Sequence, residues 1–450
     1  TTQPTAARNP RLLSIDALEA LIDSGEIDTV IVAYTDMQGR LQGKRLHATF
    51  FRDHVLAHGT EGCNYTLATD VDMNTVPGYA LTSWEAGYGD MAFKLDLGTI
   101  RRLIHLPGTV MIQCDLIWDG GAPVRVSPRS ILAEQVQRAA DRGWIALAGT
   151  ELEFIVFNTT YEDAWDSHYN VDYSILGTTR VEPLLREIRN VMHAAGTTVE
   201  SAKGECNFGQ HEIAFLYSDV ITTADNHSVY KNTAKEIAAQ HGQSITFMAK
   251  YDQREGSSCH VHMSLRGLGG ETVFWDEAAG KRSTLYDQFI AGVLATMADF
   301  TLLYAPNINS YKRFADGSFA PTTIGWGNDN RTCAIRLVGH GAAARLENRL
   351  PGGDVNPYLA LAGMLAGGLY GIEQGLELEP ELTGNAYTSD HPRVPHTLRD
   401  ARDVFESSQV ARAAFGDDVV THYVHAADTE LAAFNAAVTD WERRRGFERL

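Results

Sequence analysis

The chain has 450 residues, 44% of them hydrophobic, so it can bury a large core and form two or three domains. Its 38 Lys and Arg residues are outnumbered by 57 Asp and Glu residues, which gives a net charge of −19. This charge argues against non-specific binding to nucleic acid or to an anionic membrane, so we expect neither partner. Small cationic ligands remain compatible with it.

The cysteines indicate the compartment. They are odd in number, widely scattered and without C-x-x-C spacing: Cys63, Cys114, Cys206, Cys259 and Cys333. This arrangement predicts neither a disulfide framework nor a zinc ribbon. The opening "TTQPTAARNPRLL" has no apolar core of signal-peptide length, and no apolar run reaches the roughly 18 residues of a membrane span. We therefore expect a soluble protein of the reducing cytoplasm.

The predicted elements begin with an amphipathic helix near residues 14–24. Residues 28–48 follow as two alternating runs around a Gly-containing turn, which predicts a hairpin. At residue 127, "SPRSILAEQVQRAADRG" has Ser at the N-cap, Pro at the first helical position and Gly just past the end, which predicts a helix. We place a domain boundary before this helix and expect an N-terminal domain of residues 1–122 and a C-terminal domain of residues 123–450.

Beyond this boundary, expected helices alternate with strands or hairpins rather than with single strands. This order predicts an α+β domain with a mostly antiparallel sheet rather than a Rossmann fold. The helices are expected at about 182–195, 223–241, 284–304, 357–375 and 428–445.

Four of the predicted strands carry polar side chains on one face, because residues two positions apart in a strand point the same way. The stretches are "GTELEF", "SCHVHMSL", "ARLENRL" and the hairpin "VESAKGECNFGQHEI". In that order they contribute Glu151 and Glu153; His260, His262 and Ser264; Arg345, Glu347 and Arg349; Glu200, Glu205 and Glu212. If these faces converge, the fold collects many carboxylates in one cavity.

So many buried anions require cations, because an isolated buried carboxylate would neutralise itself. Glutamate oxygens with one imidazole suit two hard divalent ions, Mg²⁺ or Mn²⁺. Arginines in "NRTCAIR" and "ARLENR" match phosphate oxygens bidentately. The chain has no G-x-x-x-x-G-K-[ST] loop. The pattern therefore predicts phosphoryl transfer without a Walker loop.

Each pattern alone has an ordinary interpretation. Glu-x-Glu is often the solvated face of an edge strand, His-x-His often belongs to the core or surface, and Arg-x-Glu-x-Arg is often an ion-pair ladder. The combination across four strands favours a metal centre. A binuclear metal amidohydrolase is the alternative, although its ligands should be mainly His and Asp and it would need no ATP.

The same residues give the chain a family resemblance. It resembles a class I glutamine synthetase over nearly its whole length, in "DMQGRLQGKR", "SPRSI", "GTELEF", "KGECNFGQHEI", "SITFMAK", "GSSCHVHMSL", "NSYKRFADGSFAP", "NRTCAIR", "RLENRLPGGDVNPYLA" and "DWERRR". The resemblance implies an N-terminal β-grasp domain and a catalytic α/β domain with a two-metal funnel. It also implies a dodecamer of two stacked hexamers, with active sites between neighbouring subunits.

The resemblance further implies roles for individual residues. One metal is assigned to Glu153, Glu205 and Glu212, and the other to Glu151, His260 and Glu347. Nucleotide contacts are assigned to Glu200, Tyr217, His262 and Ser264, and phosphate or transition-state contacts to Arg331, Arg336, Arg345 and Arg349. Glutamate binding is assigned to Gly256 and Arg313, the amine pocket to Tyr173, and the acidic loop that reaches a neighbouring subunit to Glu61.

The implied reaction is ADP-forming: ATP phosphorylates the γ-carboxylate of glutamate, and an amine then attacks the acyl phosphate. One departure concerns the amine, because Phe319 stands where the family has a Glu that takes a proton from ammonium. A benzyl group cannot balance NH₄⁺ but can contact an alkyl group. We therefore expect an organic primary amine, with ethanolamine favoured.

Three other functions within the family remain open. The chain could be a γ-glutamylpolyamine synthetase, although a polyamine would need further carboxylates. It could be a glutamine synthetase in which Glu212 or Glu61 serves ammonium. A non-catalytic member would be expected to lack metal ligands, and all six are present.

Overall fold

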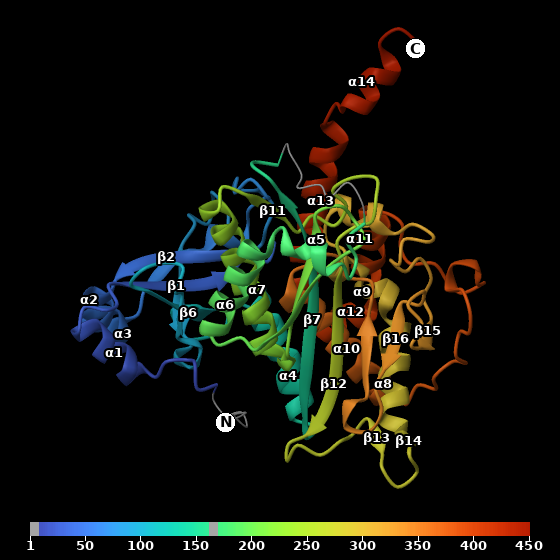
Figure 1. The fold of residues 1–450 in the computed structure, drawn as a ribbon, viewed down its shortest axis with the longest axis horizontal. Helices are drawn as coiled ribbons and strands as arrows, with labels where there is room; N and C mark the ends of the chain where they lie inside the picture. Colours follow the sequence, from blue (N-terminus) through green and yellow to red (C-terminus); the bar gives the residue numbers. More distant parts are fainter. Residues whose placement is uncertain (1–8, 162–169) are drawn as a thin grey trace.

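The computed structural model describes residues 9–161 and 170–450 and contains two large β-sheets (Figure 1). The first has the order β2-β1-β6-β4-β3, with β5 also paired to β6. Within it, β1 is antiparallel to β2, as the predicted hairpin requires, and parallel to β6. Its strands are β1 (Thr29–Thr35), β2 (Leu41–His47), β3 (Glu61–Cys63), β4 (Asp90–Leu95), β5 (Arg101–Arg102) and β6 (Thr109–Ile117).

The second sheet has nine strands in the order β15-β16-β17-β12-β7-β9-β8, with β10 and β11 also paired to β7. Its pairs are antiparallel except for β15 with β16, so the predicted mostly antiparallel sheet is confirmed. Its strands are β7 (Trp144–Phe157), β8 (Val199–Gly204), β9 (Gln210–Phe215), β10 (Ser218–Asp219), β11 (Ser244–Thr246), β12 (Cys259–Gly267), β15 (Trp326–Asn328), β16 (Ile335–Val338) and β17 (Arg345–Asn348). A separate hairpin joins β13 (Trp275–Asp276) and β14 (Lys281–Arg282).

Most predicted helices form near the expected residues. The helix predicted at Ser127 is α4, although the Ser127 side chain makes no capping hydrogen bond. The longer helices of the described residues are α1 (Ile15–Asp23), α4 (Pro128–Ala140), α6 (Glu182–Ala194), α7 (Val220–Gln240), α8 (Thr284–Ala295), α9 (Met297–Tyr304), α10 (Pro357–Gln374), α11 (Leu398–Ser407) and α13 (Asp417–Ala436). The shorter ones are α2 (Ala48–Phe50), α3 (Leu56–His58), α5 (Ile175–Thr179), α12 (Gln409–Phe415) and α14 (Asp440–Gly446), with a π-helical turn at Phe51–Val55 between α2 and α3.

Two helix predictions were wrong. The range 284–304 forms two helices, because Thr296 leaves helical geometry at φ −99° and ψ 2°. The range 428–445 also divides, since Ala437 is extended and Thr439 starts α14 through a capping box with Glu442.

The alternation of β7 gives the second sheet one helix-covered face and one polar face. Helices α4 and α7 pack against β7 (Figure 1). On that side, Thr150 contacts His227 of α7, and Leu152 lies in the core. Successive strand residues point to opposite faces, so Glu151 and Glu153 lie on the other side of the sheet.

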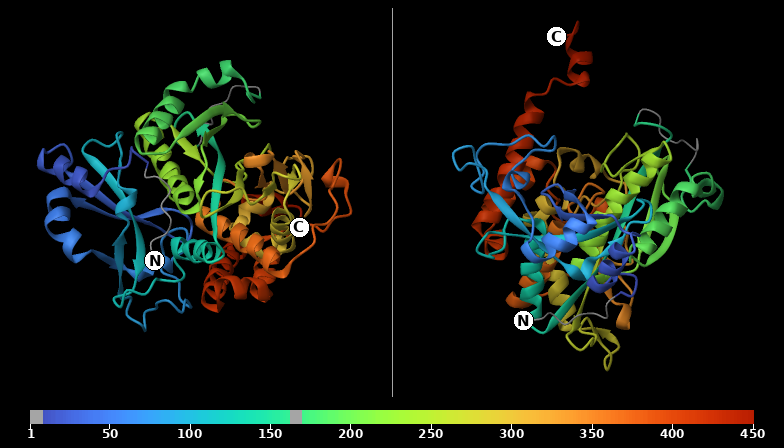
Figure 2. Two further views of the ribbon diagram at one scale, coloured as in Figure 1. Left: turned by 90° about the horizontal axis from the view of Figure 1, so that it is seen from below. Right: turned by 90° about the vertical axis from the view of Figure 1, so that its left-hand side faces the viewer.

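A charge network around the buried Arg129 joins the first sheet to helices that cover the second sheet. Arg129 of α4 is 8% exposed and donates to Asp225 of α7, at 3.0 and 3.1 Å, to Asp96 at 2.6 Å, and to Asp115 of β6. Tyr358 of α10 also donates to Asp225, at 2.5 Å. The first sheet therefore lies beside the helical layer of the second sheet (Figure 2).

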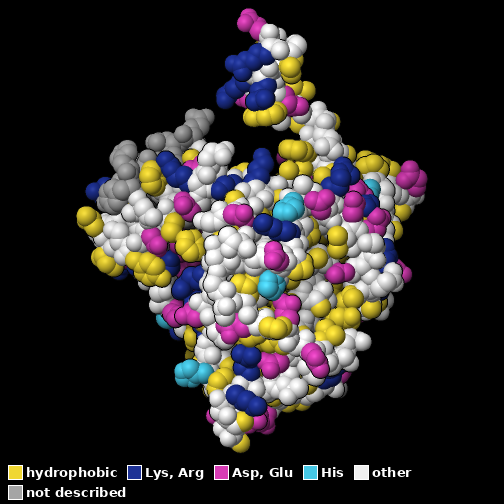
Figure 3. Space-filling view, turned by 90° about the vertical axis from the view of Figure 1, so that its right-hand side faces the viewer, with side chains coloured by type: hydrophobic (Ala, Val, Ile, Leu, Met, Phe, Trp, Pro, Cys, Tyr) yellow, Lys and Arg dark blue, Asp and Glu magenta, His cyan; other side chains and the backbone are white. Residues whose placement is uncertain are grey.

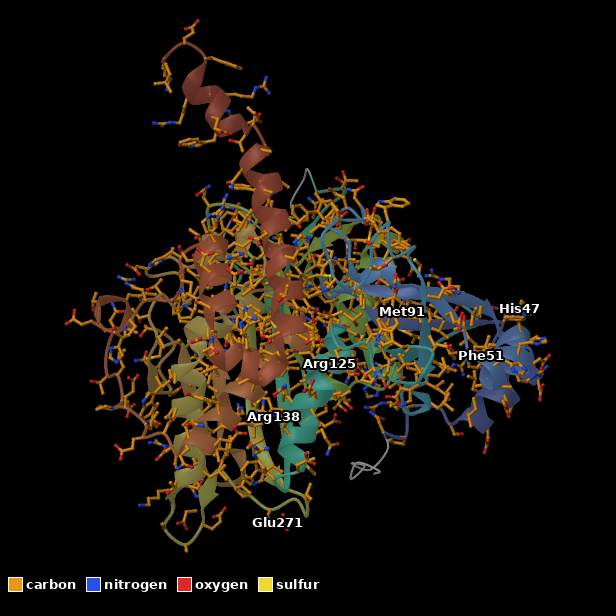
Figure 4. All side chains as sticks on the ribbon, turned by 180° about the vertical axis from the view of Figure 1, so that it is seen from behind. His47, Phe51, Met91, Arg125, Arg138 and Glu271 are labelled. Atoms are coloured by element: carbon orange, nitrogen blue, oxygen red, sulfur yellow. The ribbon has the colours of Figure 1, made fainter. Side chains whose placement is uncertain are left out.

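Helix α4 is also tied to the C-terminal helices. Arg125, just before it, pairs with Asp418 of α13 at 3.1 Å, and Arg138 pairs with Glu373 of α10 at 3.1 Å (Figure 4). Beyond α13, helix α14 projects from the body and carries a group of basic side chains (Figures 1 and 3). Across residues 9–161 and 170–450, no helix combines the length and apolar character needed to cross a bilayer.

The predicted domain boundary falls between the two sheets. Strand β6 ends at Ile117 and α4 begins at Pro128, so residue 122 lies in the connection. The division into residues 1–122 and 123–450 stays a prediction.

Candidate active site

Cross-strand pairing brings polar residues of six strands onto one face. Directly opposed residues of antiparallel strands share a face, and their side chains lie close together. The opposed residues are Lys203, Glu212 and Glu153 across β8, β9 and β7; Glu151 and His260 across β7 and β12; His262, Glu347 and Arg336 across β12, β17 and β16. The convergence predicted from the period-two patterns is thus present in the structure.

Three glutamates form the first group, here called the three-carboxylate cluster: Glu153, Glu205 and Glu212. One oxygen of each lies within 4.8 Å of the others. The backbone N–H of Ser258 (2.7 Å) and Nε2 of Gln210 (3.2 Å) donate to Glu153. Burial raises the pKa of Glu153 to about 8, assisted by the negative charge of Glu205, and burial likewise raises the pKa of Glu205 and of Glu212. The cluster is therefore short of positive charge.

Lys203 is a cation that contacts this cluster, and the sequence patterns did not identify it. Its ammonium group pairs with Glu205 and lies 3.7 Å from Asp172 and 4.6 Å from the ring centre of Tyr173. The available signal was its position two residues before Glu205, because residues at that spacing share a face in an extended chain.

The second group, here called the histidine cluster, contains Glu151, His260, His262 and Glu347. His260 Nδ1 lies 3.4 Å from Glu151 and 3.5 Å from Glu347, and His262 Nε2 lies 2.9 Å from Glu151. The ligand atoms that lie within 4.8 Å of one another belong to Glu151, His262 and Glu347. Both histidines thus reach the acids of this cluster. The assignment of His260 to metal and His262 to nucleotide stays a prediction.

The carboxylates of the histidine cluster are held ionised. Burial opposes this, but hydrogen bonds with His260 and His262 outweigh it and lower the pKa of Glu151. For Glu347, attraction to His260 and to the guanidinium of Arg349 outweighs burial and lowers its pKa. Arg349 donates to Glu347 at 2.6 Å and Arg336 at 2.9 Å.

Both clusters fit divalent cations by their donor chemistry. Burial, followed by the charge of Arg349, lowers the pKa of His260 to about 4, so its imidazole is neutral as a metal ligand must be. Among the described residues, Nε2 of His260 is buried without a hydrogen-bond partner. Predominantly carboxylate ligands suit hard ions such as Mg²⁺ or Mn²⁺.

A cavity of about 490 Å³ adjoins the histidine cluster, and Glu151 is part of its wall. Five of the residues predicted to bind the nucleotide or its phosphates line it: Glu200, Tyr217, His262, Ser264 and Arg345. Arg336 does not line it but pairs with Glu347 and Asp329. The cavity is of ligand-binding size.

The remaining arginines are in contrasting settings. Arg331 is exposed, whereas Arg349 is buried against Glu347. Arg313 is also buried, and it donates to Ser258 Oγ, to the carbonyl of Leu350 at 2.7 Å and to that of Arg349 at 2.8 Å. Its predicted pairing with the α-carboxylate of glutamate therefore stays a prediction. A Cβ at Gly256 would lie 2.9 Å from Arg313 Cγ, so this position requires a glycine.

The predicted amine-site residues lie on exposed segments. Tyr173 (φ 56°) and Phe319 (φ 60°) have left-handed backbone conformations and are 72% and 55% exposed. Next to Phe319, the carbonyl of Ala320 accepts a 3.0 Å hydrogen bond from the hydroxyl of Tyr387. Glu61 lies on β3 of the first sheet, whereas both clusters lie on the second sheet.

Comparisons with known proteins identify the family of the chain. Residues 125–446 match the model of the glutamine synthetase catalytic domain. The chain belongs to the glutamine synthetase family. A gamma-glutamylethanolamide synthetase, GlnA4 of Streptomyces coelicolor, is 59% identical over 99% of this chain and 98% of its own. A glutamate–isopropylamine ligase of a Pseudomonas species is 37% identical over 94% of this chain and 96% of its own.

The fold has close counterparts among solved structures. GmaS without ligand superposes with a TM-score of 0.86 and 26% identity, over 96% of this chain and 99% of that one. This similarity confirms the predicted glutamine synthetase fold.

Proposed function

We propose that the chain is an ATP-dependent ligase that joins the γ-carboxylate of L-glutamate to an organic primary amine, with ethanolamine favoured. The observation that carries this proposal is the polar face, where two carboxylate-rich clusters share one side of the sheet and the histidine cluster adjoins a ligand-sized cavity. The 59% identity to a gamma-glutamylethanolamide synthetase supports the choice of amine.

The polar residues have defined roles in this proposal. Glu153, Glu205 and Glu212 would hold one divalent ion, and Glu151, His260 and Glu347 the other, Mg²⁺ or Mn²⁺ in each case. When bound, such ions neutralise charge on the transferring phosphoryl group. Glu200, Tyr217, His262 and Ser264 would bind ATP, and Gly256 with Arg313 would bind glutamate.

The reaction has two steps. The γ-carboxylate oxygen of glutamate attacks the γ-phosphorus of ATP, and ADP leaves. The amine nitrogen then attacks the carbonyl carbon of the acyl phosphate, phosphate leaves, and the nitrogen loses a proton to a carboxylate such as Glu212. Arg331, Arg336, Arg345 and Arg349 would stabilise the charge of the phosphoryl group.

Phe319 supports an organic amine over ammonium. Its exposed ring offers an apolar contact and no proton acceptor. We propose that this ring and Tyr173 line the amine pocket.

The assembly and its surroundings complete the proposal. We propose a dodecamer in which Glu61 reaches the site of a neighbouring subunit. We also propose that each chain has two domains, residues 1–122 and 123–450. Its five cysteines are all free, which supports a reducing compartment, the cytoplasm.

The test is glutamate-dependent phosphate release from ATP with a panel of amines. We expect kcat/KM for ethanolamine to exceed that for ammonium. Phe319→Glu should raise kcat/KM for ammonium by about tenfold or more, because a carboxylate can balance and deprotonate NH₄⁺. Phe319→Leu, the matched control, should keep the preference of the wild type. An ammonium kcat/KM at or above that of every organic amine would overturn the choice of substrate.

A further inference from the structure

Lys203 occupies a site with the chemistry of an alkylammonium receptor. We call Asp172, Tyr173 and Glu205 the ammonium cage, because the Nζ atom of Lys203 contacts all three. Three residues of the site are partly buried, with side-chain exposures of 26% for Lys203, 31% for Asp172 and 13% for Glu205, whereas Tyr173 is 72% exposed. Carboxylates and an aromatic face are the groups that recognise an ammonium ion.

The cage adjoins the proposed reaction centre. Glu205 belongs both to the cage and to the three-carboxylate cluster. Lys203 also lies directly opposite Glu212 in the sheet. An amine that attacks an acyl phosphate beside this cluster must therefore approach close to the ammonium group of Lys203.

The acids around Lys203 are in contact with it. Its Nζ atom pairs with Glu205 and lies 3.7 Å from Asp172. The carboxylate of Asp172 is engaged as well, since it also accepts a hydrogen bond from Cys206 Sγ at 3.4 Å. Both acids of the cage thus have contacts within the chain, Glu205 with Lys203 and Oδ2 of Asp172 with Cys206.

We infer that Lys203 is a specificity-determining residue that excludes diamines and polyamines: its ammonium group, between Glu205 and Asp172, already occupies the position that a second substrate charge would take. The inference rests on the proposed ligase function and narrows its substrate class to primary amines with a neutral tail. A second ammonium group near the cage would meet a like charge at short range in a partly buried site, which disfavours its binding.

The first test compares kcat/KM for 1,4-diaminobutane and ethanolamine at saturating ATP, glutamate and Mg²⁺. Lys203→Met, which removes the charge and keeps the length, should raise the ratio of diamine to ethanolamine at least about tenfold. Lys203→Gln should act in the same direction, and Lys203→Arg should leave the ratio within about twofold. Lys281→Met, at an exposed lysine on β14, controls for the loss of one charge.

The second test measures binding, so it does not depend on turnover. Calorimetric titration of 1,4-diaminobutane into protein with ADP and Mg²⁺ should give a Kd at least about tenfold lower for Lys203→Met than for wild type. An unchanged ratio and Kd in a Lys203→Met variant with the melting temperature of wild type would overturn the inference. An equal gain in Lys203→Arg would overturn it too.

A separate reaction distinguishes failure of the proposed ligase function from failure of the proposed role of Lys203. Hydroxylamine is largely uncharged at neutral pH, so its conversion to γ-glutamyl hydroxamate reports acyl-phosphate formation without a cationic amine. No hydroxamate from wild type would refute the ligase proposal, and the titration would still decide the role of Lys203. Hydroxamate formation with unchanged diamine selectivity and binding would refute the role of Lys203 alone.

Discussion

The two clusters on the polar face hold the same kind of acid in opposite electrostatic settings. In the histidine cluster, the pKa of Glu151 and of Glu347 is lowered. In the three-carboxylate cluster, the pKa of Glu153 is raised to about 8, and that of Glu212 lies well above its usual value. Burial acts on both clusters, so it does not explain the difference.

The difference comes from the hydrogen-bond and charge partners that the chain supplies. Two arginines, Arg336 and Arg349, pair with Glu347, and two imidazoles contact Glu151. The three-carboxylate cluster has Lys203 on Glu205 and backbone or amide donors on Glu153. The histidine cluster is therefore balanced within the chain, whereas the three-carboxylate cluster depends more on a bound cation.

The largest expected effect is a loss of activity, and it should be equally large when a residue of either cluster is replaced. Glu153→Ala and His260→Ala each remove a proposed metal ligand, so we expect glutamate-dependent phosphate release to fall by about 10³-fold or more. Removal of metal by EDTA should have the same effect on wild type, and added Mg²⁺ should restore it.

An exposed acid provides the control for these variants. Glu277→Gln, on the surface before β14, should retain wild-type turnover. Turnover within tenfold of wild type by Glu153→Ala or His260→Ala would contradict the metal assignment.

Removal of a charge partner from the histidine cluster should lower the stability of the protein, whereas removal of an exposed charge elsewhere in the site should not. Arg349 is 5% exposed and pairs with Glu347, which is fully buried, so Arg349→Met leaves a buried carboxylate short of one partner. We expect a loss of about 3 kcal/mol in the free energy of unfolding, measured with denaturant in EDTA.

Arg331→Met is the matched control, because Arg331 is exposed. Both variants should lose ligase activity, and only Arg349→Met should lose stability. An equal effect of the two substitutions on stability would show that the Arg349–Glu347 pair does not balance the cluster.

The sequence predicted the members of the two clusters because side-chain alternation in a strand is a local property. Glu151, Glu153 and His260 were identified from period two alone. Alternation did not predict which of these residues lie side by side, since Glu151 and His260 are 109 positions apart and meet only because β7 lies beside β12. The family resemblance supplied that arrangement.

Lys203 shows that local sequence patterns do not predict contacts with a distant segment of the chain. Its role depends on Asp172 and Tyr173, which reach it from a loop outside strand β8, so no spacing within its own strand identifies the cage. The break between α13 and α14 was missed for a related reason. Residues 437–439 contain neither Gly nor Pro, and the helix stops because the chain turns outward into a new capping box.

The smallest expected effect is a pH dependence that distinguishes the two clusters in metal-free protein. The folded pKa of Glu153 is about 8, above its ordinary value of 4.5. The folded state therefore binds this proton more tightly than the unfolded chain, and stability falls as the pH rises between these two values. From pH 6 to pH 8 in EDTA, we expect Glu153 to contribute a loss of about 2 kcal/mol, or a few degrees in Tm.

Two glutamine variants isolate this contribution. Between pH 6 and pH 8, the Tm of the Glu153→Gln variant should fall less than the Tm of wild type, because a glutamine side chain does not titrate. Glu347→Gln should shift Tm by the same amount at both pH values, because the lowered pKa of Glu347 keeps it ionised throughout this window. If Glu153→Gln retained the full pH dependence of wild type, the charge deficit assigned to the three-carboxylate cluster would be wrong.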